Sequence, residues 1–193
     1  MSRREERMAL NRREFLCRAA AAVAIGSLPG SRLFAAPMGN PRADEVLIVQ
    51  FNAAGVKEGA VKLPKVVKTE REWRQLLLPL AFDVTRHAGT ERSFTGAYWD
   101  FHEKGVYRCT CCDTALFSSV HKFDPHTGWP SFWRPIADEN VVGPLAQTAG
   151  ADPTEVTCHR CDAHLGDIYN DGPRPTGLRY CIDSVALKFV KAP

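Results

Sequence analysis

The residues with the clearest chemical potential are cysteines in the second half of the chain. Cys109 and Cys112 form one Cys-x-x-Cys couplet, and Cys158 and Cys161 form a second couplet after 45 intervening residues. A two-residue spacer lets one turn present both sulfurs to the same ion, and a tetrahedral Zn2+ takes four such ligands. The couplets therefore predict one structural zinc site, which leaves Cys181 for chemistry. The alternative is two separate redox or disulfide couplets.

Short runs of aromatic and β-branched residues, broken by Gly, Pro and Asp, surround these cysteines. Such runs are typical of strands and turns. Helical periodicity is confined to residues 69–78, where Thr69 fits an N-cap and Pro79 a stop. Over residues 68–193 we expect a mainly β domain, an antiparallel sandwich or barrel-like fold with a few short helices. Its strands are predicted at residues 105–109, 141–145, 155–158, 178–182 and 184–190.

The N-terminal region has a different character. Arg12 and Arg13 precede an apolar run at residues 19–28 that is too short for a good membrane-spanning helix. This twin-arginine pattern predicts that residues 1–36 are an export signal, so we expect a periplasmic protein, anchored in the membrane if the leader stays uncleaved. The alternative is an amphipathic or disordered basic tail. Residues 37–67 predict an N-terminal arm or an extra hairpin.

The charge distribution narrows the class of partner. Residues 1–36 carry seven Arg and three Glu, which leaves 18 basic and 19 acidic side chains in the other 157 residues. A nearly neutral domain lacks the basic surface that binding to a phosphate backbone requires, so we expect no nucleic-acid partner. No later run is long and apolar enough to span a bilayer. One domain of this size can bury a core, and we expect a monomer.

Several strings together resemble the peptide-methionine (R)-S-oxide reductases, the B-type methionine sulfoxide reductase family. The resemblance runs from about residue 68 to residue 190. It implies a zinc-stabilised, mostly β enzyme that repairs proteins after oxidative stress by reducing the R epimer of methionine sulfoxide, with electrons from a thioredoxin-like or small-thiol donor. The strings that carry it are Gly-Thr-Glu at 89–91, Gly-Val-Tyr-Arg-Cys at 105–109, Leu-Phe-Ser at 116–118, Lys-Phe-Asp at 122–124, Gly-Trp-Pro-Ser-Phe at 128–132, His-Leu-Gly at 164–166, Asp-Gly-Pro at 171–173 and Gly-Leu-Arg-Tyr-Cys at 177–181.

Sulfoxide reduction needs a thiolate that attacks sulfur and an acid that protonates the departing oxygen. Cys181 is the candidate thiolate, which would become a sulfenic acid. Arg179 precedes it by two residues and, on a strand, points to the same face, where its charge lowers the thiol pKa. The Trp129 indole offers an apolar wall for the S-methyl group. The resemblance places His164 in the catalytic site. The alternative interpretations are that Cys181 is an inert core thiol, Trp129 a core tryptophan and His164 a structural histidine.

The chain departs from the family pattern at three positions. Asp167 replaces the second histidine of the usual His-Leu-Gly-His string, and Asp183 replaces an asparagine. Two carboxylates near a thiolate raise each other's pKa and that of Cys181, unless Arg179 and His164 offset them, and one carboxyl could then serve as the acid.

The third departure is Thr127, which stands where many members carry a resolving cysteine. We therefore expect an external thiol to reduce Cys181, with Cys111 as the alternative partner. A second reading of the whole chain is a catalytically silent, zinc-stabilised module that binds methionine-rich or oxidised partners through Trp129.

Overall fold

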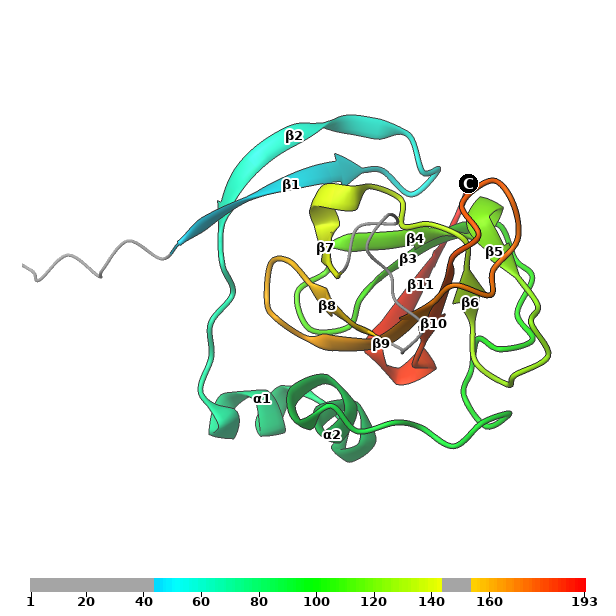
Figure 1. Cartoon of the computed structure of the whole chain (residues 1–193). Coiled ribbons are helices and arrows are strands. Elements are labelled where there is room, and N and C mark those ends of the chain that lie inside the picture. Colours follow the sequence, from blue (N-terminus) through cyan, green and yellow to red (C-terminus); the bar gives the residue numbers. More distant parts are fainter. Residues whose placement is uncertain (1–43, 144–153) are drawn as a thin grey trace, which may run out of the picture. The chain divides into compact units, whose positions relative to one another are not determined.

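A computed structural model describes residues 44–143 and 154–193, and the export signal predicted at residues 1–36 lies outside these residues. The predicted mainly β, antiparallel class with a few short helices is confirmed (Figure 1). The elements are β1 Glu45–Phe51, β2 Lys57–Pro64, α1 Glu70–Leu76, α2 Pro79–His87, β3 Gly105–Cys109, β4 Ala115–Ser118, η1 Ser119–His121, β5 Lys122–Phe123, β6 Ser131–Phe132, η2 Asp138–Asn140, β7 Val141–Val142, β8 Thr154–Cys158, β9 His164–Tyr169, β10 Arg179–Ile182, η3 Ser184–Ala186 and β11 Leu187–Lys191.

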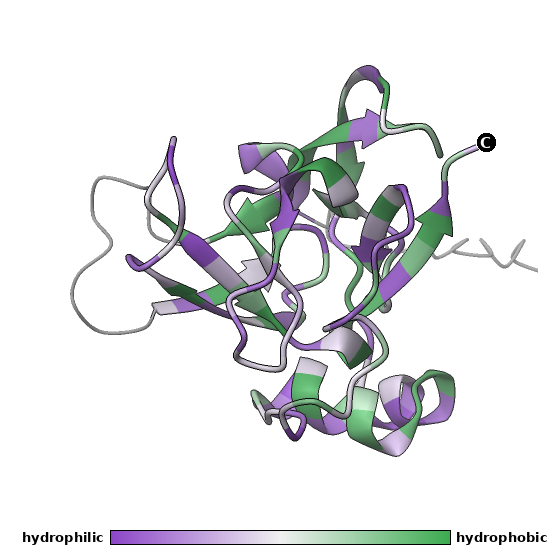
Figure 2. Ribbon diagram, turned by 90° about the vertical axis from the view of Figure 1, so that its right-hand side faces the viewer, coloured by the Kyte–Doolittle hydropathy of each residue, from purple (hydrophilic) through white to green (hydrophobic). Residues whose placement is uncertain are grey.

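The strands form three antiparallel sheets. The largest has the order β5-β6-β10-β9-β8-β7, the second β11-β3-β4, and the third is the hairpin β1-β2. Hydrophobic and hydrophilic residues alternate along several of the strands (Figure 2), and along β1 buried residues mostly alternate with exposed ones. The first two sheets share one core, in which the Phe117 and Phe132 rings stack at 4.5 Å and Tyr107 meets Phe132 edge-on at 5.0 Å. This core fixes β10, which carries Cys181.

The hairpin β1-β2 covers part of the second sheet (Figure 1). Val49 and Phe51 of β1 pack with Val106 and Ala115 of that sheet. The fully buried Asn140 amide accepts a hydrogen bond from the Val49 N–H and donates to the Val49 carbonyl, both at 2.8 Å. The Asn140 side chain thus takes the place that a neighbouring strand would have beside Val49 of β1. The hairpin is therefore held by hydrogen bonds to its backbone as well as by apolar packing.

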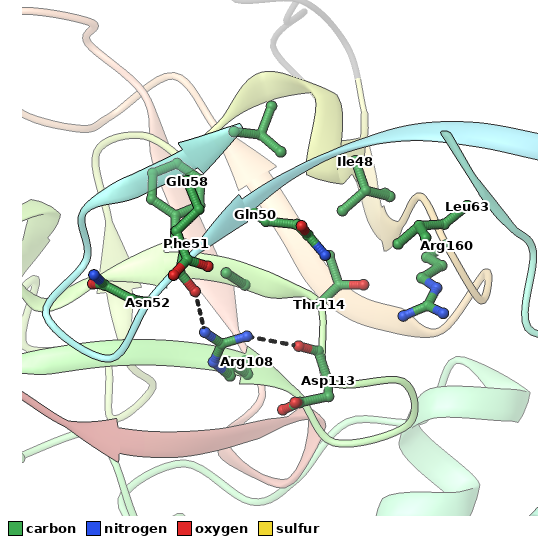
Figure 3. Close-up of a pocket in the computed structure, with 12 residues that line it drawn as sticks. Ile48, Gln50, Phe51, Asn52, Glu58, Leu63, Arg108, Asp113, Thr114 and Arg160 are labelled. Atoms are coloured by element: carbon green, nitrogen blue, oxygen red, sulfur yellow. Dashed lines mark hydrogen bonds between the residues drawn. The ribbon is translucent and has the colours of Figure 1, made fainter. Parts of the chain in front are cut away.

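A hollow of about 380 Å³ lies between this hairpin and the turn after β3 (Figure 3). Arg108 spans one end of it, because its guanidinium donates to the backbone carbonyls of Phe51 and Asp113. Gln50 and Thr114 line the middle, and none of the lining residues is a predicted site residue. The hollow is therefore a feature of the hairpin contact and separate from the face that carries Cys181.

The helical region differs from the prediction in one respect. Helix α1 begins after Thr69, whose hydroxyl accepts from the Glu72 N–H while the Glu72 carboxylate accepts from the Thr69 N–H, a complete capping box. Pro79 then opens a second helix, α2, that the sequence did not predict. Proline ends one helix but suits the first position of the next, because that N–H has no helical partner. Neither helix is long and apolar enough to cross a bilayer.

The predicted C-terminal strand at residues 184–190 is corrected at its start. Residues 184–186 form the 3-10 turn η3, and only Leu187–Lys191 form strand β11. The Glu91 carboxylate explains the difference, because it accepts from the Ser184 N–H at 2.7 Å and the Val185 N–H at 3.2 Å. These two N–H groups are therefore unavailable for hydrogen bonds to a neighbouring strand. Of the strand predicted at 141–145, Val141–Val142 is a strand, Gly143 is a bend outside it, and residues 144 and 145 lie outside the described part.

Candidate active site and metal centre

The four couplet cysteines meet at one point. Their sulfurs all lie within 4.8 Å of one another, with Cys109 Sγ 3.6 Å from Cys161 Sγ and Cys112 Sγ 3.5 Å from Cys158 Sγ. A tetrahedral zinc with Zn–S bonds of about 2.3 Å holds its sulfurs about 3.8 Å apart. The donor set and its dimensions therefore fit a closed metal site, and the two couplets do not form separate pairs.

Two equivalent turns create this geometry. The Asp113 N–H donates to the Cys109 carbonyl at 3.0 Å, and the Asp162 N–H donates to the Cys158 carbonyl at 2.9 Å. Both aspartates have a left-handed backbone, with φ of 66° and 54°. Aspartate tolerates this conformation better than most residues, so each turn reverses tightly and brings its second sulfur back beside the first.

Cys181 lies at the centre of the largest sheet, on the face away from the core. Its neighbours Tyr180 and Ile182 are buried in the core, whereas the Cys181 thiol is half-buried. Across the strands it is paired with Asp167 of β9 and Ser131 of β6, and its thiol hydrogen-bonds the Ser131 side chain. A reachable sulfur with polar neighbours on both sides is the arrangement expected of a nucleophile.

Arg179 is fixed on the same strand as Cys181. Its Nε and Nη2 donate to the Asp171 carboxylate at 2.8 and 2.9 Å, and its guanidinium carbon lies 4.1 Å from the Tyr169 ring centroid. Such a bidentate and stacked guanidinium is held rigidly. The salt bridge also lowers the pKa of Asp171.

The electrostatic balance at Cys181 favours the thiol. Burial raises the Cys181 pKa above its usual value, and the carboxylates of Asp183 and Asp167 raise it further. The Arg179 charge and the hydrogen bond with Ser131 lower the pKa but do not offset the rise. The sequence predicted the opposing effects of the two carboxylates and Arg179, but not those of burial and Ser131.

Asp183 is the most perturbed carboxyl of the site. It is 3% exposed, and burial raises its pKa to about 7, with the Glu91 and Asp167 carboxylates acting in the same direction. The Glu91 N–H donates to Asp183 Oδ1 at 2.8 Å and the His164 charge lowers the pKa, but burial outweighs both. Asp183 therefore exchanges a proton near neutral pH, which a general acid requires.

His164 opens strand β9 and is almost fully buried. Its Nδ1 lies 2.8 Å from the Glu155 carboxylate, which fixes the ring and leaves Nε2 for another partner. Two residues later, Gly166 has φ of +144°, and a Cβ there would lie 2.1 Å from the Cys181 carbonyl oxygen. Only glycine lets β9 approach β10 this closely, which sets Asp167 directly beside Cys181.

The loop that carries Trp129 is hydrogen-bonded to strand β10. The Pro130 carbonyl accepts from the Ile182 N–H at 3.0 Å, directly after Cys181. The Trp129 indole N–H donates to the Glu91 carbonyl at 3.1 Å, so the ring is held in one orientation by a residue far away in the sequence. The structure thus brings together all six predicted residues of the catalytic face, which are Cys181, Arg179, Asp183, Asp167, His164 and Trp129.

Sequence reasoning missed the partners that orient these groups. Glu91, Asp171 and Glu155 each bind a predicted site residue, and Ser131 bonds the thiol. Glu91 and Asp171 lie in the Gly-Thr-Glu and Asp-Gly-Pro strings of the family pattern. Their charge was the feature that could have indicated a role in the site. Their partners depend on strand pairing, which the strings do not show. Cys111 lies in the first couplet, in contact with the sulfurs of Cys109 and Cys161.

Comparison with known proteins agrees with this geometry. The SelR domain model matches residues 77–191. The peptide methionine sulfoxide reductase MsrB of Herminiimonas arsenicoxydans is 53% identical over 129 residues, which cover 67% of this chain and 94% of that protein. The MsrB of Hahella chejuensis is 48% identical over 130 residues, covering 67% of this chain and 94% of that protein. The chain therefore belongs to the family of B-type peptide methionine sulfoxide reductases.

Proposed function

We propose that this protein reduces the R epimer of methionine sulfoxide in oxidised proteins, with Cys181 as nucleophile and Asp183 as general acid. Methionine sulfoxide reduction itself follows from membership of the family. The observation that supports the assignment of residues is the placement of a half-buried thiol beside a carboxyl of pKa about 7. The Trp129 indole, held nearby, provides the apolar wall for the S-methyl group.

The reaction balances when Asp183 supplies one proton and the Cys181 thiolate supplies two electrons. The Cys181 thiolate attacks the sulfoxide sulfur while the carboxyl proton of Asp183 passes to the oxygen. The S–O bond to the substrate breaks, the oxygen leaves as hydroxyl on the Cys181 sulfur, and methionine departs with two more electrons than it had as the sulfoxide. The sulfenic acid on Cys181 is then reduced by two external thiols, which become a disulfide and release water.

A protonated Asp183 serves this reaction in two ways. It supplies the proton, and in its neutral form it no longer raises the Cys181 pKa, since that effect comes from the carboxylate charge. Asp167 is paired with Cys181 across the strands, and its charge opposes ionisation of the thiol. His164 orients the acid side of the site, because its charge acts on Asp183 while Glu155 holds its other nitrogen.

An external thiol is the proposed reductant. Among the described residues, the cysteines other than Cys181 are Cys111 and the four metal-site cysteines. Cys181, Asp167 and Glu155 lie side by side on β10, β9 and β8, so Cys181 is two strands, or about 10 Å, from β8. Cys158 lies three residues, or about 10 Å, further along β8. A disulfide requires Cα atoms within about 7 Å, so Cys111, which belongs to the metal cluster, is out of reach.

The finer assignments of cofactor and location are also proposals. We propose that the metal is zinc, in a structural role, because four thiolates close its coordination shell and leave no position for substrate. The twin-arginine motif supports export to the periplasm as a folded monomer, which would protect the zinc thiolates from oxidation before the fold forms.

Turnover of the purified R and S epimers of N-acetyl-methionine sulfoxide with dithiothreitol tests the proposal. Wild type should reduce the R epimer, and Cys181→Ser should fold and reduce neither. If zinc-loaded wild-type protein with a free Cys181 thiol reduces neither epimer, the chain is a silent binding module instead.

A further inference from the structure

The structure points to an aromatic ledge, formed by the exposed Phe94 and the half-buried Trp99, as a docking surface for the substrate polypeptide. We infer that the ledge receives an apolar side chain close to the methionine sulfoxide in the sequence of the oxidised protein. This inference rests on the proposed function and adds a preference among protein substrates to it.

The backbone of Phe94 is unusual. Its φ is +63°, a left-handed conformation that glycine, asparagine and aspartate adopt readily and that is a genuine outlier for a bulky residue. The other residues of this kind in the described part are Ala88, which caps helix α2, Asp113 and Asp162 in the couplet turns, and His126. Strained residues cluster at ligand sites, where the surrounding structure maintains them.

The neighbouring loop maintains the strain at Phe94. Its N–H donates to the Gly128 carbonyl at 2.9 Å, and a Cβ at Gly128 would lie only 2.7 Å from a carbon of the Phe94 ring. The Phe94 ring therefore rests directly on the backbone of Gly128, the residue before Trp129. Any movement of Phe94 requires that loop to move, so the ring belongs to the rigid rim of the site.

The held conformation keeps the Phe94 ring in solvent. The side chain is 54% exposed, and its contact with another ring is an edge-on approach to Trp99, with centroids 5.3 Å apart. A conformation that costs free energy and still leaves an aromatic ring half in water gains nothing for the core. The remaining use of such a ring is contact with a partner.

The position of the ledge decides what that partner is. Gly128, on which the Phe94 ring rests, lies three residues before Ser131, which opposes Cys181, so the backbone between the two residues spans no more than about 11 Å. The sulfoxide side chain itself must sit at the thiol. A residue one to three positions away in an extended peptide is displaced by about 3 to 10 Å, which reaches the ledge.

The test compares three peptides that differ only three positions from the sulfoxide: acetyl-Leu-Ser-Ser-Met(O)-Ser-Ser-Ser-amide, acetyl-Ser-Ser-Ser-Met(O)-Ser-Ser-Leu-amide and acetyl-Ser-Ser-Ser-Met(O)-Ser-Ser-Ser-amide. Wild type should turn over at least one leucine peptide with a kcat/KM about tenfold above that of the serine peptide. Phe94→Gly, which relieves the strained backbone and removes the ring, should bring that ratio close to one. Phe94→Tyr, which keeps the ring, should keep the ratio.

Controls separate this inference from the proposed function. Val67→Ala, which alters another exposed apolar residue, should leave both the ratio and the rate unchanged. The inference is overturned if wild type shows no preference, or if Phe94→Gly lowers kcat/KM equally for all three peptides, which would mean that Phe94 only supports the Trp129 loop. Failure of wild type to reduce N-acetyl-methionine sulfoxide would contradict the proposed function instead.

Discussion

Replacement of Asp183 by Asn is the sharpest test of the proposed acid. Asn keeps the shape, and its Oδ1 can still accept from the Glu91 N–H, so the variant removes the ionisable proton with little change in packing. Burial raises the Asp183 pKa from 3.8 to about 7 in the folded protein. A difference of about three pKa units corresponds to about 4 kcal/mol of differential stability between protonation states.

The sign follows from proton binding. Between pH 4 and pH 7 the folded protein holds a proton on Asp183 that the unfolded chain has lost, so this residue contributes a stability that declines as pH rises to about 7. Above that pH the loss is complete. Asp183→Asn removes the decline, so the variant should be more stable than wild type by up to about 4 kcal/mol at pH 8 and by much less at pH 4.

Urea denaturation at pH 4, 6 and 8 measures this difference, and steady-state rates measure the catalytic one. Wild-type kcat should fall as pH rises through about 7, since the acid loses its proton. Asp183→Asn should lose that limb and about 100-fold or more in kcat, the usual contribution of a general acid. A stability difference that does not change with pH, or a variant with wild-type kcat at pH 6, would refute the reasoning.

Further predictions concern the thiol, the metal and the departures from the family pattern. Adding Asp167→His to Asp183→Asn gives the family's usual residues at both positions and should recover most of the lost kcat; no recovery would show that another group is the acid. Cys109→Ser removes a metal ligand, so the yield of soluble protein should collapse and bound zinc, measured by atomic absorption, should be lost; soluble zinc-free protein would contradict a structural metal. Mass spectrometry after one turnover without reductant should find a dimedone-reactive sulfenic acid on Cys181, whereas a disulfide to Cys111 would exclude the external-thiol route.

The parts of the site that were predictable are the parts that the sequence encodes locally. The two couplets predicted a four-sulfur cluster, because a Cys-x-x-Cys turn needs no distant partner to present its sulfurs. Arg179 and Cys181 were predicted on one face because side chains alternate along a strand. The pairing of Cys181 with Ser131 and Asp167 was not predictable, since strand order depends on the whole core.

The misreadings of the fold have local physical causes. Pro79 was read as a stop, yet the same ring also starts α2, and the sequence alone does not distinguish the two uses. The start of the strand at 184–190 was misread because the Glu91 carboxylate, more than 90 residues away, takes the N–H groups of Ser184 and Val185. An apolar run predicts a strand only if no side chain competes for its donors.

Glu91 also shows how one residue can position both sides of the proposed site. Its carboxylate binds the turn after Asp183, its N–H binds the Asp183 carboxyl, and its carbonyl binds the Trp129 indole. The acid and the wall for the methyl group are therefore positioned by one buried residue, which is 2% exposed. Burial keeps the Asp183 pKa high, whereas the two effects of Glu91 oppose each other, because its N–H bond lowers that pKa more than its charge raises it. An aspartate in place of the usual asparagine can therefore serve as an acid only where burial raises its pKa this far, and in the proposed mechanism this carboxyl offsets the loss of the second histidine at Asp167.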